Sequence, residues 1–319
     1  VGIGSGLPLL SNGLIRADEM LHVTTAFASF SGQAGAWPVG QSALFSLLCS
    51  VLFRVRFFVR SVIGSAETVN WTDDFAVDPS GYFLLGRLLC AVFGVATVYV
   101  VYRLGRRMAG ASTGLAAALL FAVAPLAVRE AHALIPDMLT VFLLSGLVLA
   151  LFDYLVAPAS DERRCVSIAA VWMGLAFATQ VTALLALPAV LLALGLKMLV
   201  HGSRRMVAGV CVFAAVSFTI WLLVGVVAGT HTRNSGAIFA AVWEQWFGHP
   251  AGRAEWTLRE GLTRLYGMLR FGPGETVGLA LAAFGLIWRP WRSWGSGMLV
   301  VGLTAILPTL IALLAANTV

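Results

Sequence analysis

Long apolar runs, separated by short basic turns, constrain this chain more than any other feature. Hydrophobic residues make up 59% of the sequence and charged residues only 11%, whereas soluble domains carry about 25% charged residues. Several runs reach the roughly 20 residues that a helix needs to cross a bilayer. They are continuous rather than alternating, which disfavours a transmembrane barrel. The sequence therefore predicts an all-α, polytopic transmembrane helical bundle.

The basic residues indicate which way the bundle faces. Most of those in short turns fall on one side of the predicted spans, at 103–107, 163–164, 197–205 and 289–292. The positive-inside rule makes this side cytoplasmic, so the net charge of +6 indicates basic turns rather than nucleic-acid binding. We expect a multi-pass protein of the plasma (inner) membrane, in contact with the lipid bilayer. The outer face then receives 18–82, 129–137, the segment around Gln180, and 230–274.

The lengths of the runs predict how the chain is divided. As one helix, 165–200 would be roughly 54 Å long against a hydrocarbon core of about 30 Å, so we expect a re-entrant-like hairpin with its apex at 179–182. Both ends of the sequence are apolar, and we expect a fragment of a longer protein. The expected parts are the tail of a first transmembrane helix whose start is missing (1–17), a first external loop with two interfacial helices (18–82), a transmembrane core (83–229), an external loop (230–274) and C-terminal transmembrane helices (275–319).

Within the first external loop we expect helices at 18–30 and 38–59, followed by a polar loop over 61–82. The second helix is apolar enough to cross the membrane, but crossing would put Asp18 and Asp137 on opposite faces. We expect it to lie on the membrane surface instead, as the family resemblance given below implies, with Arg54, Arg56 and Arg60 at the lipid headgroups.

Acidic and basic side chains gather on the predicted outer face. The chain has only 15 acidic residues, yet Asp18 and Glu19 are adjacent and His22 follows one helical turn later. Ionisable groups at the rim of a bundle are costly unless they are paired or functional. An acid beside cations and a lipid phase can deprotonate an acceptor hydroxyl while the cations hold the phosphate of a lipid carrier. The other candidates on this face are Arg87, Arg129, Glu130, His132 and Asp137.

Four short motifs, each weak alone, follow one another in a specific order. They are Asp18-Glu19, Gly86-Arg87-Leu88-Leu89 through Tyr102-Arg103-Leu104-Gly105-Arg106-Arg107, Ala124-Pro125 with His132 and Asp137, and Gly174-Leu175-Ala176 with Ala178-Thr179-Gln180. Over residues 15 to about 200 the chain resembles the GT-C superfamily of glycosyltransferases. The resemblance is to the polyprenyl-phosphate-sugar-dependent branch, related to protein O-mannosyltransferases and aminoarabinose transferases. The chain departs from the family where Ala36-Trp37-Pro38-Val39 lacks a basic residue and where Gln180 replaces a common lysine.

The resemblance implies inverting transfer of a sugar from a polyprenyl-phosphate sugar lipid to an acceptor glycan, lipid or protein. Asp18 would be the general base, Glu19 would orient Asp18 or contact the acceptor, and Asp137 would fix the cations or the sugar. Arg87, Arg129 and His132 would bind the donor phosphate, while Gln180 and His22 would contact the acceptor or a metal. No metal site and no cofactor is predicted, although a divalent cation at His22 and Asp18 stays open.

Other interpretations of the same residues remain. Asp18-Glu19 and Asp137 could simply begin helices, where acids are favourable. A lipid or sugar transporter or flippase would use Arg87, Asp137 and Gln180 as a polar pathway. Carriers often show internal repeats and broken helices in both halves, whereas the sequence suggests a single interruption, at 179–182. A third alternative is a non-catalytic GT-C-like subunit of a membrane assembly.

Overall fold

The computed structural model describes residues 17–28, 42–64, 71–158, 160–201 and 203–227. Most of these residues are helical and none of them forms a strand, which confirms the all-α prediction. The expectations for 1–16, 230–274 and 275–319 lie outside the described residues. The helices, in chain order, are α1 (Ala17–Ala28), α2 (Ala43–Ile63), α3 (Trp71–Val77), α4 (Pro79–Ala109), α5 (Ala111–Ala122), α6 (Pro125–Ala131), α7 (Asp137–Val156), α8 (Glu162–Thr179), the 3-10 helix η2 (Val181–Ala186), α9 (Leu187–His201) and α10 (Ser203–Val227).

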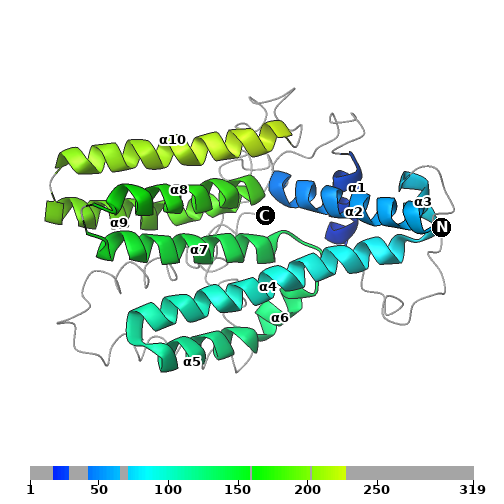
Figure 1. Ribbon diagram of the computed structural model, residues 1–319, viewed down its shortest axis with the longest axis horizontal. Coiled ribbons are helices and arrows are strands. Elements are labelled where there is room, and N and C mark those ends of the chain that lie inside the picture. Colours follow the sequence, from blue (N-terminus) through cyan, green and yellow to red (C-terminus); the bar gives the residue numbers. More distant parts are fainter. Residues whose placement is uncertain (1–16, 29–41, 65–70, 159, 202, 228–319) are drawn as a thin grey trace, which may run out of the picture.

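Two groups of helices meet along α4 (Figure 1). Helices α7 to α10 lie side by side around an apolar core that includes Leu147, Leu151, Val190 and Leu194. Helix α4 packs against α7 on one side and against α5 on the other, while α1, α2 and α3 lie beside its N-terminal part. A second apolar cluster joins α1 and α2 to α4 and α7, and its members include Val23, Phe45, Phe83 and Leu139.

Three helices among the described residues are long and apolar enough to cross a membrane. They are α4, α7 and the stretch Ala208–Gly225 of α10. Helices α5 and α6 would together make a fourth span, but they meet at a bend of 62°. These helices make the protein a membrane protein, as the composition predicts.

Glycines allow two pairs of helices to approach closely, as is common in membrane bundles. A Cβ atom on Gly105 of α4 would lie 2.9 Å from the Cα of Gly114 on α5. On α8, a Cβ atom on Gly174 would lie 2.7 Å from the carbonyl oxygen of Ser217 on α10. Neither contact leaves room for a larger side chain unless the helix backbones separate.

The expected loop over 61–82 is wrong, because α3 and the first turn of α4 form there. Asp73 and Asp74 lie in the first turn of α3, where carboxylates favour a helix. Asp78 precedes α4, whose first residue is a proline, and proline suits this position.

Arg56 and Arg60 were expected at the lipid headgroups, but in the structure they bind carboxylates of residues 71–78. Arg56 Nη2 lies 2.5 Å from Asp78 Oδ2, and Arg60 Nη1 lies 3.0 Å from Asp74 Oδ1. Tyr82 Oη donates to Asp74 Oδ2 at 2.7 Å. Ion pairs thus fasten α2 to α3 and to the start of α4.

Two breaks interrupt the apolar runs. At Gln180 the chain leaves α8, and Figure 1 shows α9 returning along the bundle in the opposite direction. The second break, between α5 and α6, was not expected, because 111–128 reads as one continuous span. Pro125 explains it, since a proline disfavours helical geometry in the residue before it, and Ala124 is extended (φ −64°, ψ 121°).

Candidate active site

The carboxylate of Glu19 is the point at which three distant segments of the chain meet. Glu19 lies on α1, and its side chain is 1% exposed. Arg87 of α4 binds both of its oxygens, through Nε at 3.0 Å and Nη2 at 2.8 Å. The backbone N–H of Leu134, just before α7, donates to Oε1 at 2.8 Å. We call these three residues the Glu19 latch. A bidentate, charge-assisted pair of this kind fixes orientation as well as distance.

The face of α4 beside the latch is shaped to receive the segment before α7. Leu134 is fully buried and lies over Gly86, where a Cβ atom would come within 1.9 Å of Leu134 Cδ1. One turn along α4, Cys90 Sγ donates to the carbonyl oxygen of Ile135 at 3.4 Å. The missing side chain at Gly86 therefore lets Leu134 come close enough for its N–H to reach Glu19.

Asp137 forms a second polar pair, between the start of α7 and the end of α8. Its Oδ1 accepts a hydrogen bond from Gln180 Nε2 at 2.7 Å. Gln180 is also contacted by Thr182, whose Oγ1 lies 3.3 Å from Gln180 Oε1. Leu134 and Asp137 are three residues apart, so their Cα atoms are at most about 11 Å apart. The Glu19 latch and the Asp137–Gln180 pair therefore lie at the same end of the bundle.

Asp18 and His22 share α1 with Glu19. The backbone of Asp18 is helical and next to the latch, but its side chain lies outside what the structure describes. His22 is 9% exposed, and its ring meets the Phe45 ring edge-on at 5.6 Å. No cluster of three potential metal ligands occurs among the described residues. A cation at His22 stays a prediction.

Arg129 and His132 lie on the surface next to the latch. Both are exposed, and they precede Leu134 by five and two residues. Arg129 Nη2 lies 2.7 Å from Glu130 Oε1, and His132 Nδ1 is 2.6 Å from the carbonyl oxygen of Val128. The structure thus joins Glu19 to Arg87 and Asp137 to Gln180, and leaves the side chains of Arg129 and His132 accessible.

Sequence reasoning missed how these residues pair. The assignment of Arg87 to a phosphate stays a prediction, but the sequence did not indicate that its guanidinium binds Glu19. A lone arginine in an apolar span needs a partner, and the scarcity of acids would have pointed to the Asp18-Glu19 pair. The donor from Leu134 carries no sequence signal, because every residue except proline has a backbone N–H.

Comparisons with known proteins bear on part of the chain. Residues 83–228 match the family model described as dolichyl-phosphate-mannose-protein mannosyltransferase. The match runs from α4 through α10, so it contains Arg87, Arg129, His132, Asp137 and Gln180, and it begins after Asp18 and Glu19. Searches of curated proteins and of solved structures gave no match.

Proposed function

Residues 83–228 belong to the dolichyl-phosphate-mannose-protein mannosyltransferase family, within the GT-C superfamily, and from this we propose a specific reaction. The protein is a membrane glycosyltransferase of the GT-C type. We propose that it moves a sugar from a polyprenyl-phosphate carrier to a hydroxyl of a glycan, lipid or protein acceptor. The reaction takes place on the outer face of the plasma membrane and inverts the sugar's anomeric configuration.

The length of α4 supports this placement of the site. Its 31 residues would extend about 46 Å, whereas the hydrocarbon core is about 30 Å thick. If the basic residues from Arg103 onward mark the cytoplasmic edge, the core ends roughly 20 residues earlier, near Phe83. Arg87 then lies about 6 Å inside the outer edge, where a lipid-linked phosphate can meet a water-soluble acceptor.

Helix α2 lies beside the N-terminal part of α4 (Figure 1). Only about 6 Å of α4, from Pro79 to Phe83, projects beyond the core on this side. One face of α2 exposes Val51, Val55, Phe58 and Val62, which are 51–70% exposed. Their helical spacing makes a continuous apolar stripe. We propose that this stripe enters the outer lipid surface and brings α1 close to the lipid carrier.

The Glu19 latch is the observation that carries the catalytic proposal. Both oxygens of Glu19 are engaged by Arg87, and one also by Leu134, so this carboxylate is poorly suited to accept a proton. Its neighbour Asp18 is then the carboxylate assigned to that task. Glu19 is a positioning residue, because it fixes α1 against α4 and the segment before α7.

In the proposed reaction the acceptor oxygen forms a bond to the anomeric carbon of the sugar as the bond from that carbon to the carrier phosphate breaks. Asp18 takes the proton of the acceptor hydroxyl. The phosphate leaves with the electron pair, and Arg129 and His132 stabilise its charge. Asp137, oriented by Gln180, holds the sugar. A single displacement of this kind inverts the configuration and needs no covalent enzyme intermediate.

A transporter or flippase is the competing function, and one observation favours it more than the sequence did. The apolar runs have two breaks among the described residues, before Pro125 and at Gln180, rather than one. Broken helices are common in carriers. The family of residues 83–228 still favours the transferase.

Labelled donor in sealed vesicles separates the two functions. The transferase predicts that label from a polyprenyl-phosphate sugar appears in a hydroxyl acceptor with inverted anomeric configuration. A carrier predicts that labelled lipid or sugar changes sides without joining an acceptor. Movement without any labelled product would overturn the proposed function.

A further inference from the structure

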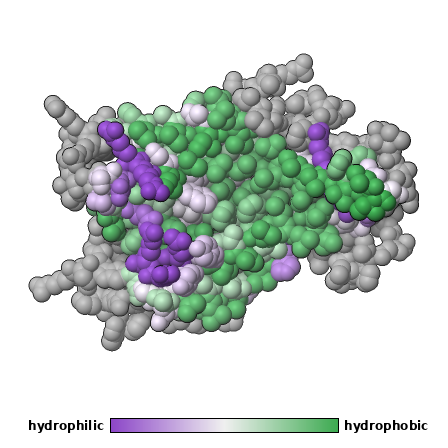
Figure 2. All heavy atoms as spheres, in the orientation of Figure 1, coloured by the Kyte–Doolittle hydropathy of each residue, from purple (hydrophilic) through white to green (hydrophobic). Residues whose placement is uncertain are grey.

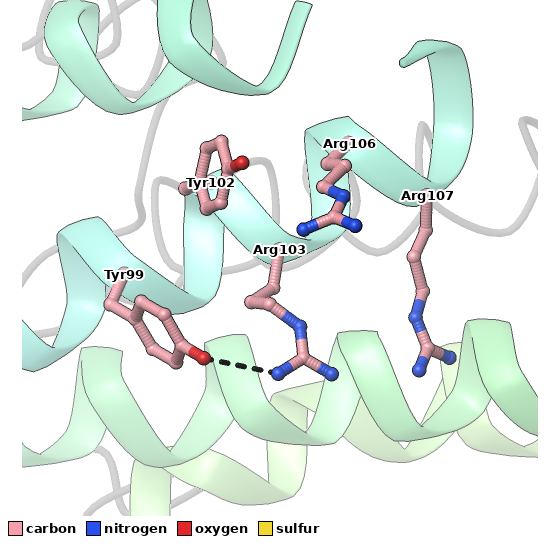
Figure 3. Close-up of a pocket in the computed structure, with 5 residues that line it drawn as sticks. All are labelled: Tyr99, Tyr102, Arg103, Arg106 and Arg107. Carbon is pink, nitrogen blue, oxygen red and sulfur yellow. Dashed lines mark hydrogen bonds between the residues drawn. The ribbon is translucent and has the colours of Figure 1, made fainter. Parts of the chain in front are cut away.

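A basic pocket lies near the end of α4 opposite to the Glu19 latch. Its volume is about 480 Å³, and Figure 3 shows the residues that line it, Tyr99, Tyr102, Arg103, Arg106 and Arg107. From Arg87 to Arg103 the helix rises about 24 Å, so the pocket takes no part in the chemistry proposed above. In Figure 2 hydrophilic residues gather at one end of the molecule, beside a broad apolar surface.

Among the described residues, only one of the three arginines in this pocket forms an ion pair with a carboxylate. Arg107 is ion-paired with Asp153 of α7. Arg103 Nη1 donates to the phenol oxygen of Tyr99 at 3.1 Å, and the arginine lies 5.9 Å from that ring's centre. Within the part of the chain that the structure describes, neither Arg103 nor Arg106 has a carboxylate partner. Two guanidinium groups one helical turn apart therefore face an open space, an arrangement that suits a phosphate.

An exposed apolar stripe leads along α4 to these arginines. Leu84, Leu88, Val92, Val95 and Tyr99 are 52–72% exposed. Spaced three and four residues apart, they lie on the face of the helix that continues to Arg103 and Arg106. A free phosphate would need only the arginines. A molecule with an acyl chain and a phosphate headgroup would cover both the stripe and the pocket.

We propose that this surface is a binding site for an anionic phospholipid of the cytoplasmic leaflet. The acyl chain lies along Val92 and Val95, and the headgroup phosphate binds Arg103 and Arg106. Basic side chains at the cytoplasmic end of a transmembrane helix attract anionic headgroups. Tyr99 lies where chain and headgroup meet, a common position for tyrosine. The site is independent of Asp18 and of the transfer reaction.

The test is lipid binding to purified protein in detergent, followed by native mass spectrometry. Phosphatidylglycerol should bind, and phosphatidylcholine, whose headgroup is neutral overall, should bind far more weakly. Replacing both Arg103 and Arg106 by glutamine should weaken phosphatidylglycerol binding by roughly thirtyfold, and Arg106→Gln alone by roughly fivefold. The single variant keeps the test informative if the double variant does not fold. Arg163→Gln is the matched control, because Arg163 is exposed on α8 and does not line the pocket.

Two further measurements distinguish a lipid headgroup from free phosphate as the ligand of this pocket. Val95→Ser should weaken lipid binding, and inorganic phosphate at millimolar concentration should not displace the lipid. Equal binding by the wild type and Arg106→Gln would overturn the proposal. So would an equal loss in Arg163→Gln, or displacement by inorganic phosphate, which would point to a site for a soluble anion.

Discussion

Glu19 on α1 and Arg87 on α4 form a bidentate ion pair across 68 positions of the sequence, with Nη2 2.8 Å from Oε2. The side chain of Glu19 is 1% exposed and that of Arg87 is 22% exposed. The pair fixes the short helix that carries Asp18 against a long transmembrane helix. The contribution of this ion pair to stability can be measured separately from catalysis.

Removing one member of the pair should destabilise the fold. Arg87→Ala leaves the buried Glu19 carboxylate without its cation, at a cost of about 3–5 kcal/mol. Thermal unfolding in detergent should show a clear fall in midpoint, and the double variant Glu19→Gln/Arg87→Ala should be less unstable than the two single effects summed. The control pair is Arg129 and Glu130, where Arg129 is 64% exposed, and Arg129→Ala should change the midpoint little. Additive effects at Glu19 and Arg87 would contradict a coupled pair.

The contact between α4 and α5 should not tolerate a methyl group. A Cβ atom on Gly114 would lie 2.7 Å from the carbonyl oxygen of Tyr102, and forced overpacking costs about 1–3 kcal/mol. Gly114→Ala should therefore lower the unfolding midpoint. Gly195→Ala on α9 is the matched control, because no described residue lies within 4 Å of its Cβ position. There alanine should be neutral or slightly stabilising. If both variants behave alike, the close approach of the two helices is wrong.

The ion pair between Arg56 and Asp78 should make stability depend on pH. Burial alone would raise the pKa of Asp78, but hydrogen bonds from Ser80 and Arg56, the charge of Arg56 and a bond from the Gly81 backbone outweigh it, and the pKa falls below the ordinary 3.8. Because the folded-state pKa is depressed, the stabilisation is present above about pH 4 and is lost as pH falls through the folded pKa. Wild type should unfold at a higher temperature than Asp78→Asn at pH 7, and the gap should narrow below pH 4. If the difference in unfolding temperature between wild type and Asp78→Asn widened on acidification, the pKa of Asp78 would be raised in the folded protein rather than lowered.

Gln180 should act through Asp137. Gln180→Leu removes the donor that lies 2.7 Å from Asp137 Oδ1, and an unsatisfied acceptor costs about 1–3 kcal/mol. We expect a lower unfolding midpoint and slower sugar transfer. Gln180→Lys keeps a donor and adds a positive charge, so it should restore the midpoint and lower KM for the lipid donor. If leucine and lysine have the same effect on transfer, Gln180 does not position Asp137.

Hydropathy predicted the three span-length helices in α4, α7 and α10, because the cost of burying polar groups in lipid fixes the length and content of a span. The ends of the helices were predicted less well. Helix α4 extends beyond the apolar run 83–102 at both ends, since Pro79 suits the first position of a helix and the arginines at 103, 106 and 107 do not stop one. The break before Pro125 was missed because hydropathy does not register backbone geometry.

The sequence predicted which residues make up the candidate site, but not which of them contact one another. The sequence singled out Glu19, Arg87, Asp137 and Gln180 as unusual polar groups in an apolar chain. Whether Glu19 contacts Arg87 depends on where α1 lies relative to α4, and whether Asp137 contacts Gln180 depends on how α7 packs against α8. Packing between segments this far apart has no signature in a single sequence.

The most direct test of the central claim is the rate of sugar transfer by Asp18→Asn. Asparagine has nearly the same shape and cannot accept the acceptor's proton, so transfer from a polyprenyl-phosphate sugar should fall about 10²- to 10⁴-fold. The unfolding midpoint should stay near that of the wild type. Asp161→Asn, the same change at an exposed residue preceding α8, should transfer sugar at the wild-type rate. Transfer by Asp18→Asn at the wild-type rate would contradict Asp18 as the general base.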